Sequence, residues 1–318
     1  MLTVSAKNRS VQSLFFLMIG AGVGLVMSYA ADMPNKVFFV IALGLAFPFA
    51  TLLIQDLRRF LIVATIFTIP IHFDINFMHT FERQAGASTA GITLTDIFLI
   101  GLLLIWIIEI ATKDKPYAVF FARISVPAIL YFEAAALSML WAPRLDLAFM
   151  EVLRMFKVFL LYFILINNIR DKHDLRLAVW ALIGTVAFEG IIAGLQILKG
   201  GRLGLEFLGE APPDPDGDAS MWRVMGTLGH PNKLATYIES LLLLSIGMFL
   251  VEKKKILKFL SMAIFSLGSI TLIMTGSRGA WIGFLMAFVV FIFFSMRNKA
   301  INMRSLVKPI IVALLILA

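Results

Sequence analysis

The sequence contains no cysteine and only four histidines among its 318 residues. The absence of cysteine excludes disulfide bonds, thiolate nucleophiles, and cysteine-ligated zinc or iron–sulfur sites. So few histidines do not favour a multi-histidine metal site either. We therefore expect neither a metal ion nor a metal-dependent reaction.

Charged residues are also scarce. They make up 15% of the chain, whereas a soluble protein carries about 25%. Hydrophobic residues reach 60%, and the mean hydropathy is +0.92. This deficit of charge is too large for a globular core and predicts many membrane spans. In a membrane protein, a net charge of +8 mainly reflects the lysine and arginine residues that flank the spans on the cytoplasmic side. We therefore expect membrane lipid around the chain and no nucleic-acid partner.

The hydrophobic runs predict an all-α integral membrane protein, a polytopic helical bundle with about ten complete spans. An eleventh span begins near Leu306 and is truncated at Ala318. We therefore expect residues 1–318 to form one polytopic membrane domain that is incomplete at its C-terminus. The polar segment 72–91 is interpreted as a loop at the level of the lipid headgroups. The complete spans are predicted at about 11–31, 37–54, 60–71, 93–111, 124–141, 147–166, 177–198, 233–251, 256–274 and 280–296.

The distribution of lysine and arginine predicts the orientation of these spans. With the N-terminus in the cytoplasm, eighteen of the 28 basic residues fall on inside segments, eight fall on outside segments, and Arg154 and Lys157 lie within the sixth span. This excess on the short inside loops agrees with the positive-inside rule. The long loop 199–232 and the turn at Arg278 are therefore expected to face outward.

The middle of loop 199–232 is acidic and rich in proline. It superficially resembles a calcium loop starting at Asp214, but the bidentate glutamate required at the twelfth position is replaced by Met225. We interpret the acidic part as a solvated turn. Its acidic residues are Glu206, Glu210, Asp214, Asp216 and Asp218.

The end of this loop leads directly into a hydrophobic helix and has the features of an anion site. Gly226 and Gly229 permit close backbone approach, Pro231 suits a first helical turn, and Asn232 is a suitable cap. A helix N-terminus attracts anions, and Arg223 could form a bidentate pair with phosphate. The equally weighted alternative is a tight interfacial loop whose arginine lies among lipid headgroups.

Two short motifs carry a resemblance to a known family. The first is Arg223-x-x-Gly226-x-x-Gly229-His230-Pro231-Asn232-x-x-Ala235, and the second is Thr275-Gly276-Ser277-Arg278-Gly279. Together they resemble the O-antigen ligase and O-antigen polymerase family, over roughly residues 220–285. The earlier predicted spans agree with that family only in hydropathy.

The resemblance implies a glycosyltransferase C-like helical fold in the bacterial inner membrane. It also implies transfer of an oligosaccharide or polysaccharide from undecaprenyl diphosphate, on the periplasmic side, without cofactor or metal. The acceptor would be a lipid A core sugar, a growing glycan or a protein hydroxyl. The family's catalytic histidine belongs to a loop beyond the eleventh span, so His230 does not match it.

Residue by residue, the resemblance assigns the donor diphosphate to Arg223 and Arg278. The motif residues beside them are assigned to substrate binding, namely Gly226, Gly229, His230, Asn232 and Ser277. The resemblance implies an inverting displacement in which the diphosphate is the leaving group. Two fixed guanidinium groups would stabilise its negative charge, because arginine stays protonated in a low-dielectric site.

Ionisable residues within predicted spans supply further candidates. Glu151 and Arg154 share a helix face and are expected to pair, with Lys157 one turn further along. This face, with Arg154 and Lys157, either lines a cavity for the lipid phosphate or forms an ion pair between helices, with equal weight. Asp96 and Glu239 are interpreted as packing residues.

Two other functions remain open from the sequence. One is a polysaccharide polymerase of the same family, which would share both motifs. The other is a transporter or flippase that uses the charged face of the sixth span as its pathway. No symmetry between halves of the sequence supports a transporter.

Overall fold

The computed structural model describes residues 56–72, 74–79, 89–112, 125–211 and 223–297. The spans predicted at 11–31 and 37–54, the eleventh span, and Asp214, Asp216 and Asp218 lie outside the described residues. The described part is mostly helical, and five of its helices are long and apolar enough to cross a membrane. The five are α4 (Leu94–Thr112), α7 (Lys172–Lys199), α8 (Pro231–Val251), α9 (Lys255–Met274) and the part of α10 from Arg278 to Ser295.

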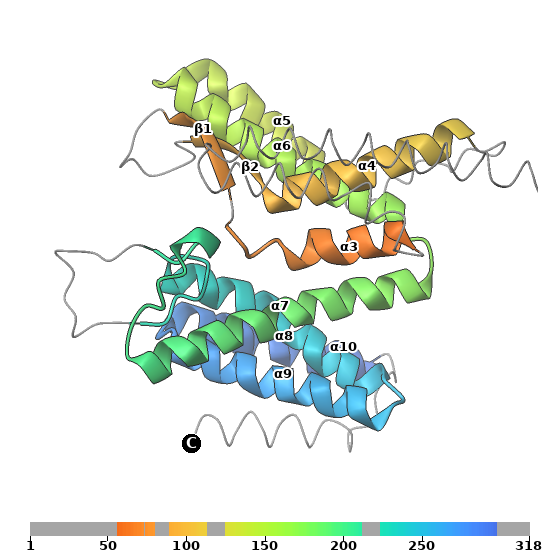
Figure 1. Cartoon of the computed structure of the whole chain (residues 1–318), viewed down its shortest axis with the longest axis vertical. Helices are drawn as coiled ribbons and strands as arrows, with labels where there is room; N and C mark the ends of the chain where they lie inside the picture. The colour runs from red at the N-terminus through yellow and green to blue at the C-terminus, as the bar shows by residue number, and fades with distance from the viewer. Residues whose placement is uncertain (1–55, 73, 80–88, 113–124, 212–222, 298–318) are drawn as a thin grey trace, which may run out of the picture.

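The helices form two groups joined through α3 (Figure 1). The first group contains α4 (Leu94–Thr112), α5 (Ser125–Ser138) with the short 3-10 helix η1 (Met139–Trp141), and α6 (Leu145–Asn168). The second contains α7 (Lys172–Lys199), α8 (Pro231–Val251), α9 (Lys255–Met274) and α10 (Arg278–Arg297). Helix α3 (Leu57–Phe67) packs between α4 and α7.

Each group has its own apolar core. In the second group, Ile183 of α7, Ile238 and Leu242 of α8, and Phe265 of α9 are at most 1% exposed. The other core joins α3, α4, α6 and the first half of α7, with Leu61 and Leu102 fully buried. Many large apolar side chains on the outer helix faces are exposed, as expected for helices surrounded by lipid.

The described part is mostly helical, as predicted, and contains one hairpin where the sequence predicted a loop. Segment 72–91 was expected to be a loop, but β1 (Asp74–His79) and β2 (Thr89–Thr93) pair as an antiparallel hairpin. The hairpin register shifts between Asn76 and Met78. Apolar residues do occupy every second position, at Ile75 and Phe77 and at Ala90 and Ile92, so the sequence carried a short strand signal.

Helices α8, α9 and α10 follow one another through short turns, so α8 and α10 begin at the same end of the second group. We call this the loop end, because α7 also ends there and residues 200–230 follow it. A short 3-10 helix, η2 (Glu206–Leu208), lies in this loop. The segment after α3 reaches the same end, where the His72 N–H donates to the Leu208 carbonyl at 3.0 Å.

The opposite end is basic, and ion pairs fix it. We call it the basic end; it contains the starts of α3, α7 and α9 and the ends of α8 and α10. Asp174, fully buried near the start of α7, accepts from Arg58 Nη1 and Arg59 Nε, both at 2.7 Å. Arg176 pairs with Glu252, at the end of α8, at 2.6 Å. The cost of burying these carboxylates is thus offset by their pairing with arginines where the helices meet.

Candidate functional site

The loop that carries the first motif is clamped onto the second half of α7. Glu189 is fully buried, and its carboxylate accepts from the Thr227 N–H at 3.0 Å and from the Thr227 hydroxyl. The Thr227 hydroxyl also lies 3.1 Å from the Pro70 carbonyl, beyond α3. A buried carboxylate with several donors holds a loop firmly, because moving the loop would leave that carboxylate unpaired.

Gln196, seven residues further along the same face of α7, holds the preceding residues of the loop. Its side-chain oxygen accepts from the N–H groups of Met225 and Gly226 at 3.2 and 3.1 Å. Its amide nitrogen donates to the Gly226 carbonyl at 3.3 Å and to the Glu210 carboxylate at 2.6 Å. Gln196 is fully buried, and these four bonds use its whole hydrogen-bonding capacity.

Glu210 is not part of a solvated turn, as the sequence suggested, but a buried anchor with 2% exposure. The N–H groups of Leu203, Gly204 and Leu205 donate to its carboxylate at 2.8–3.1 Å. Burial alone would raise the pKa of Glu210. The backbone donors and the Gln196 amide outweigh burial, so the pKa of Glu210 lies below its ordinary value of 4.5.

Gly226 shows how closely the loop approaches α7. Its φ is +57°, a left-handed conformation, and a Cβ atom added there would lie 2.0 Å from Glu189 Oε2. Only glycine satisfies both conditions without displacing the carboxylate. Gly226 of the first motif thus has a packing role against α7.

Arg223 joins the two motifs. Its Nε donates to the carbonyl of Thr275, the first residue of the second motif. Its Nη2 donates to Asn232 Oδ1, in the first turn of α8, at 3.0 Å. Gly276 permits this approach, since its φ is +62° and an added Cβ atom would lie 3.2 Å from Arg223 Nε. Two segments about fifty residues apart therefore meet at one guanidinium.

The second motif forms the turn from α9 into α10. Thr275 is buried, and its hydroxyl donates to the Leu272 carbonyl at 2.6 Å. The Ser277 N–H lies 3.3 Å from that hydroxyl, and the Trp281 indole donates to the Leu272 carbonyl at 3.0 Å. Arg278 begins α10 immediately after this fixed turn and is exposed.

The arginines of the two motifs differ from most others in their partners. Within the described residues, Arg278 makes no hydrogen bond or ion pair, and Arg223 has no carboxylate partner. Arg223 uses two of its five N–H donors on protein acceptors. By contrast, a carboxylate pairs with each of Arg58, Arg59, Arg144, Arg154, Arg170 and Arg176. Among the described residues, therefore, no carboxylate neutralises either motif arginine.

His230 has a role that the sequence assigned to its neighbour. Asn232 was expected to cap α8, but the N-cap is His230, whose Nδ1 accepts from the Asn232 N–H at 3.1 Å. Asn232 lies within the first turn and uses its side-chain oxygen to accept from Arg223. The histidine ring is exposed, so its remaining Nε2 can still face a ligand.

The starts of α8 and α10 lie at the loop end beside Arg223, Asn232 and Arg278. The N-terminus of a helix carries a partial positive charge and unsatisfied N–H groups. Two such termini with two arginines suit a ligand with more than one negative charge.

The charged face of α6 belongs to the other helix group. Arg154 pairs with Glu151, as expected, and its side chain is 62% exposed. Lys157 instead pairs with Asp96 of α4 and donates to the Gly91 carbonyl of β2 at 3.0 Å. The ion-pair alternative therefore fits Lys157, and the structure does not bring this face into contact with Arg223.

One cluster has the ligand types of a cation site. Asp171, His173 and Asp174 lie close together at the start of α7. Asp174 is already paired with two arginines, and Asp171 pairs with Arg59 at 3.1 Å. Two guanidinium groups beside the carboxylates disfavour a bound cation there.

Three residues that build the site were not predicted as such. Glu210 was assigned to a solvated turn, and no role was predicted for Glu189 or Gln196. A carboxylate and an amide seven residues apart in an apolar run share one helix face, which is a signal that could have been found.

Comparison with known proteins identifies no relative of this chain. No family model, curated protein or solved structure matches the chain. Function is therefore inferred from the site: two linked motifs, two arginines without a carboxylate partner among the described residues, and two helix N-termini at the loop end.

Proposed function

We propose that the chain is a membrane glycosyltransferase of the O-antigen ligase type. It would move an oligosaccharide or polysaccharide from undecaprenyl diphosphate to a lipid A core sugar, a growing glycan or a protein hydroxyl. The single observation that carries this proposal is the contact of Arg223 with both Asn232 and Thr275, which joins the two motifs of the family resemblance.

The chemistry requires what this end of the protein offers. As the anomeric bond breaks, the leaving diphosphate gains negative charge, and fixed guanidinium groups stabilise that charge most when they need not reorganise. The Thr275 carbonyl and Asn232 hold Arg223 in place before a ligand arrives. Arg278 has no carboxylate to compete with phosphate among the described residues. The acceptor hydroxyl also needs a base, and the family resemblance implies a histidine in that role which His230 does not match by position.

The membrane arrangement is part of the same proposal. We propose a glycosyltransferase C-like bundle in the bacterial inner membrane, with about ten complete spans, an eleventh span near the C-terminus and a cytoplasmic N-terminus. The loop end would face the periplasm. This orientation is supported by the basic residues at the opposite end, including Arg58, Arg176 and Lys253 to Lys255.

Replacement of each motif arginine tests the proposal. Arg223→Ala and Arg278→Ala should each abolish glycan transfer in membranes supplied with a lipid-linked donor and an acceptor. The matched control is Arg297→Ala, at the other end of α10, which should transfer normally. Immunoblotting of the membrane fraction should show equal amounts of all three proteins.

Undiminished transfer by both motif variants would overturn the assignment of the donor site. Movement of the lipid-linked glycan across vesicles without transfer to any acceptor would instead identify a flippase. If transfer occurs, the product separates the related activities: a polymerase lengthens the glycan, whereas a ligase attaches it to lipid A core or protein.

A further inference from the structure

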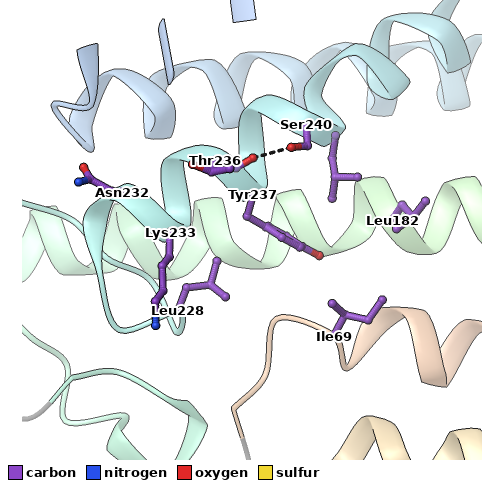
Figure 2. Close-up of a pocket in the computed structure, with 9 residues that line it drawn as sticks. Ile69, Leu182, Leu228, Asn232, Lys233, Thr236, Tyr237 and Ser240 are labelled. Atoms are coloured by element: carbon purple, nitrogen blue, oxygen red, sulfur yellow. Dashed lines mark hydrogen bonds between the residues drawn. The ribbon is translucent and has the colours of Figure 1, made fainter. Parts of the chain in front are cut away.

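A groove of about 660 Å³ runs along α8 from its first turn at the loop end (Figure 2). It lies between α8, α7 and the segment after α3. Its apolar wall includes Leu182 of α7, Ile69 beyond α3, and Leu228 of the first motif loop. The groove therefore touches the loop that Glu189 and Gln196 hold in place.

The hydroxyl groups of Tyr237 and Ser240, which line the groove, already have protein partners. Tyr237 Oη lies 2.6 Å from Thr185 Oγ1, and Ser240 Oγ donates to the Thr236 carbonyl at 2.6 Å. What these side chains offer a ligand is mostly ring and methylene surface. Such a surface favours hydrocarbon and gives a polar sugar little to bind.

The mouth of the groove is positively charged. Lys233 lines it, is exposed, and makes no ion pair or hydrogen bond with any described residue. Figure 2 shows its side chain extending beside Leu228. Asn232, the next lining residue, accepts from Arg223 at 3.0 Å. The groove and the arginine site therefore share Asn232.

These features define a ligand with an anionic head and an apolar chain. From Asn232 to Ser240 the groove follows eight residues of helix, about 12 Å along the axis. Lys233 lies at its mouth, Arg223 contacts the lining residue Asn232, and Arg278 lies at the same end of the bundle. None of these three has a carboxylate partner among the described residues. Three such cations match a diphosphate better than the single charge of most phospholipids.

We infer that this groove binds the first part of the polyprenyl chain of the donor, and that Lys233 is a third cation for its diphosphate. The inference rests on the proposed function, since it takes the donor's head to lie at Arg223 and Arg278. It adds the place of the lipid chain and a binding residue outside both motifs.

The test measures binding of two probes to the purified full chain in detergent. Undecaprenyl diphosphate has a long chain, whereas isopentenyl diphosphate has only five carbons and should not reach Ser240. Because burial of each methylene strengthens binding several-fold, the wild type should prefer the long probe by about tenfold or more. Ser240→Trp, which fills the groove, should remove most of that preference and leave the short probe unaffected.

Matched controls separate the groove from general effects. Ile270→Trp places the same ring on an exposed position of α9 and should bind both probes as the wild type does. If Ser240→Trp does not fold, Thr236→Phe fills the same groove from another exposed position. Lys233→Gln should weaken both probes about tenfold, whereas Lys255→Gln at the basic end should change neither.

Several results would overturn the inference. One is that the wild type binds both probes equally well. A second is that Ser240→Trp weakens both probes equally. A third is that phosphatidylglycerol displaces the long probe as well as unlabelled undecaprenyl diphosphate does. Unchanged binding in Lys233→Gln would remove the third cation. If Arg223→Ala still weakens both probes, the donor site stands while the groove fails. If Arg223→Ala weakens neither, the proposed function fails.

Discussion

Gly226→Ala is the substitution for which the structure gives the sharpest expectation. The added methyl group would lie 2.0 Å from Glu189 Oε2, far inside van der Waals contact. Either the loop or the carboxylate must move. Movement of the carboxylate breaks its bonds to the Thr227 N–H and hydroxyl, and movement of the loop shifts Arg223, three residues earlier.

The magnitude follows from two contributions. A left-handed conformation such as φ +57° costs a residue with a Cβ atom about 1–2 kcal/mol. Loss of two hydrogen bonds to a buried carboxyl group costs about 1.5 kcal/mol each, the value at which the ranges for neutral and charged partners meet. We therefore expect Gly226→Ala to lower the free energy of unfolding by about 4–5 kcal/mol.

Gly247→Ala in α8 is the matched control. No heavy atom lies within 4 Å of a Cβ atom added at Gly247. In the interior of a helix, alanine is favoured over glycine by about 1 kcal/mol, so the control should be slightly stabilised. Thermal unfolding of the detergent-purified proteins measures both changes, and the glycan transfer assay should show a large loss of activity for Gly226→Ala alone.

The pair Gly226→Ala with Glu189→Ala isolates the steric contact. Removing the carboxylate vacates the space for the new methyl group, so the double variant should be less destabilised than the sum of the single variants. If Gly226→Ala unfolds at the wild-type temperature and retains full transfer activity, the clamp of the loop onto α7 is wrong.

The remaining predictions concern the ion pairs and the loop anchor. Because the folded-state pKa of Glu210 is below 4.5, its stabilisation is fully present above pH 4.5 and is lost as the pH falls through that lower pKa. The gap in thermal unfolding temperature between wild type and Glu210→Gln should therefore be wide at pH 7 and narrow below pH 4.5; a constant gap would contradict the anchor. Asp174→Asn removes the buried carboxylate that pairs with Arg58 and Arg59, so the free energy of unfolding measured in urea should fall by about 3 kcal/mol. A fall of less than about 1 kcal/mol would show that the pair is not buried. Arg154→Ala, whose side chain is 62% exposed, should change the unfolding free energy by less than about 1 kcal/mol, and a larger loss would mean that the side chain is buried in the membrane.

The helices of the described part could largely be predicted from hydropathy. The span predicted at 256–274 is α9 at Lys255–Met274, and that at 93–111 is α4 at Leu94–Thr112. Hydropathy succeeds there because lipid imposes the same requirement on each span separately. It failed at the start of α7, which begins at Lys172 and not at Leu177, since the charges of its first turn are neutralised by partners on α3.

The clamp at the candidate site could not be predicted in the same way. The bonds of Thr227 to Glu189 and of Gln196 to Glu210 join residues that are 38 and 14 positions apart. No local pattern reports such a partner, so Glu210 looked like one more acidic residue in a polar loop. Arg223 and the second motif were named from the sequence, but their contact at Thr275 depends on how α8, α9 and α10 pack.

An experimental structure of the full chain with undecaprenyl diphosphate bound is the most direct test of the central claim. The account expects the phosphate oxygens within about 3 Å of the guanidinium nitrogens of both Arg223 and Arg278, at the shared start of α8 and α10. A diphosphate bound elsewhere, or held with Arg278 out of hydrogen-bonding reach, would contradict it.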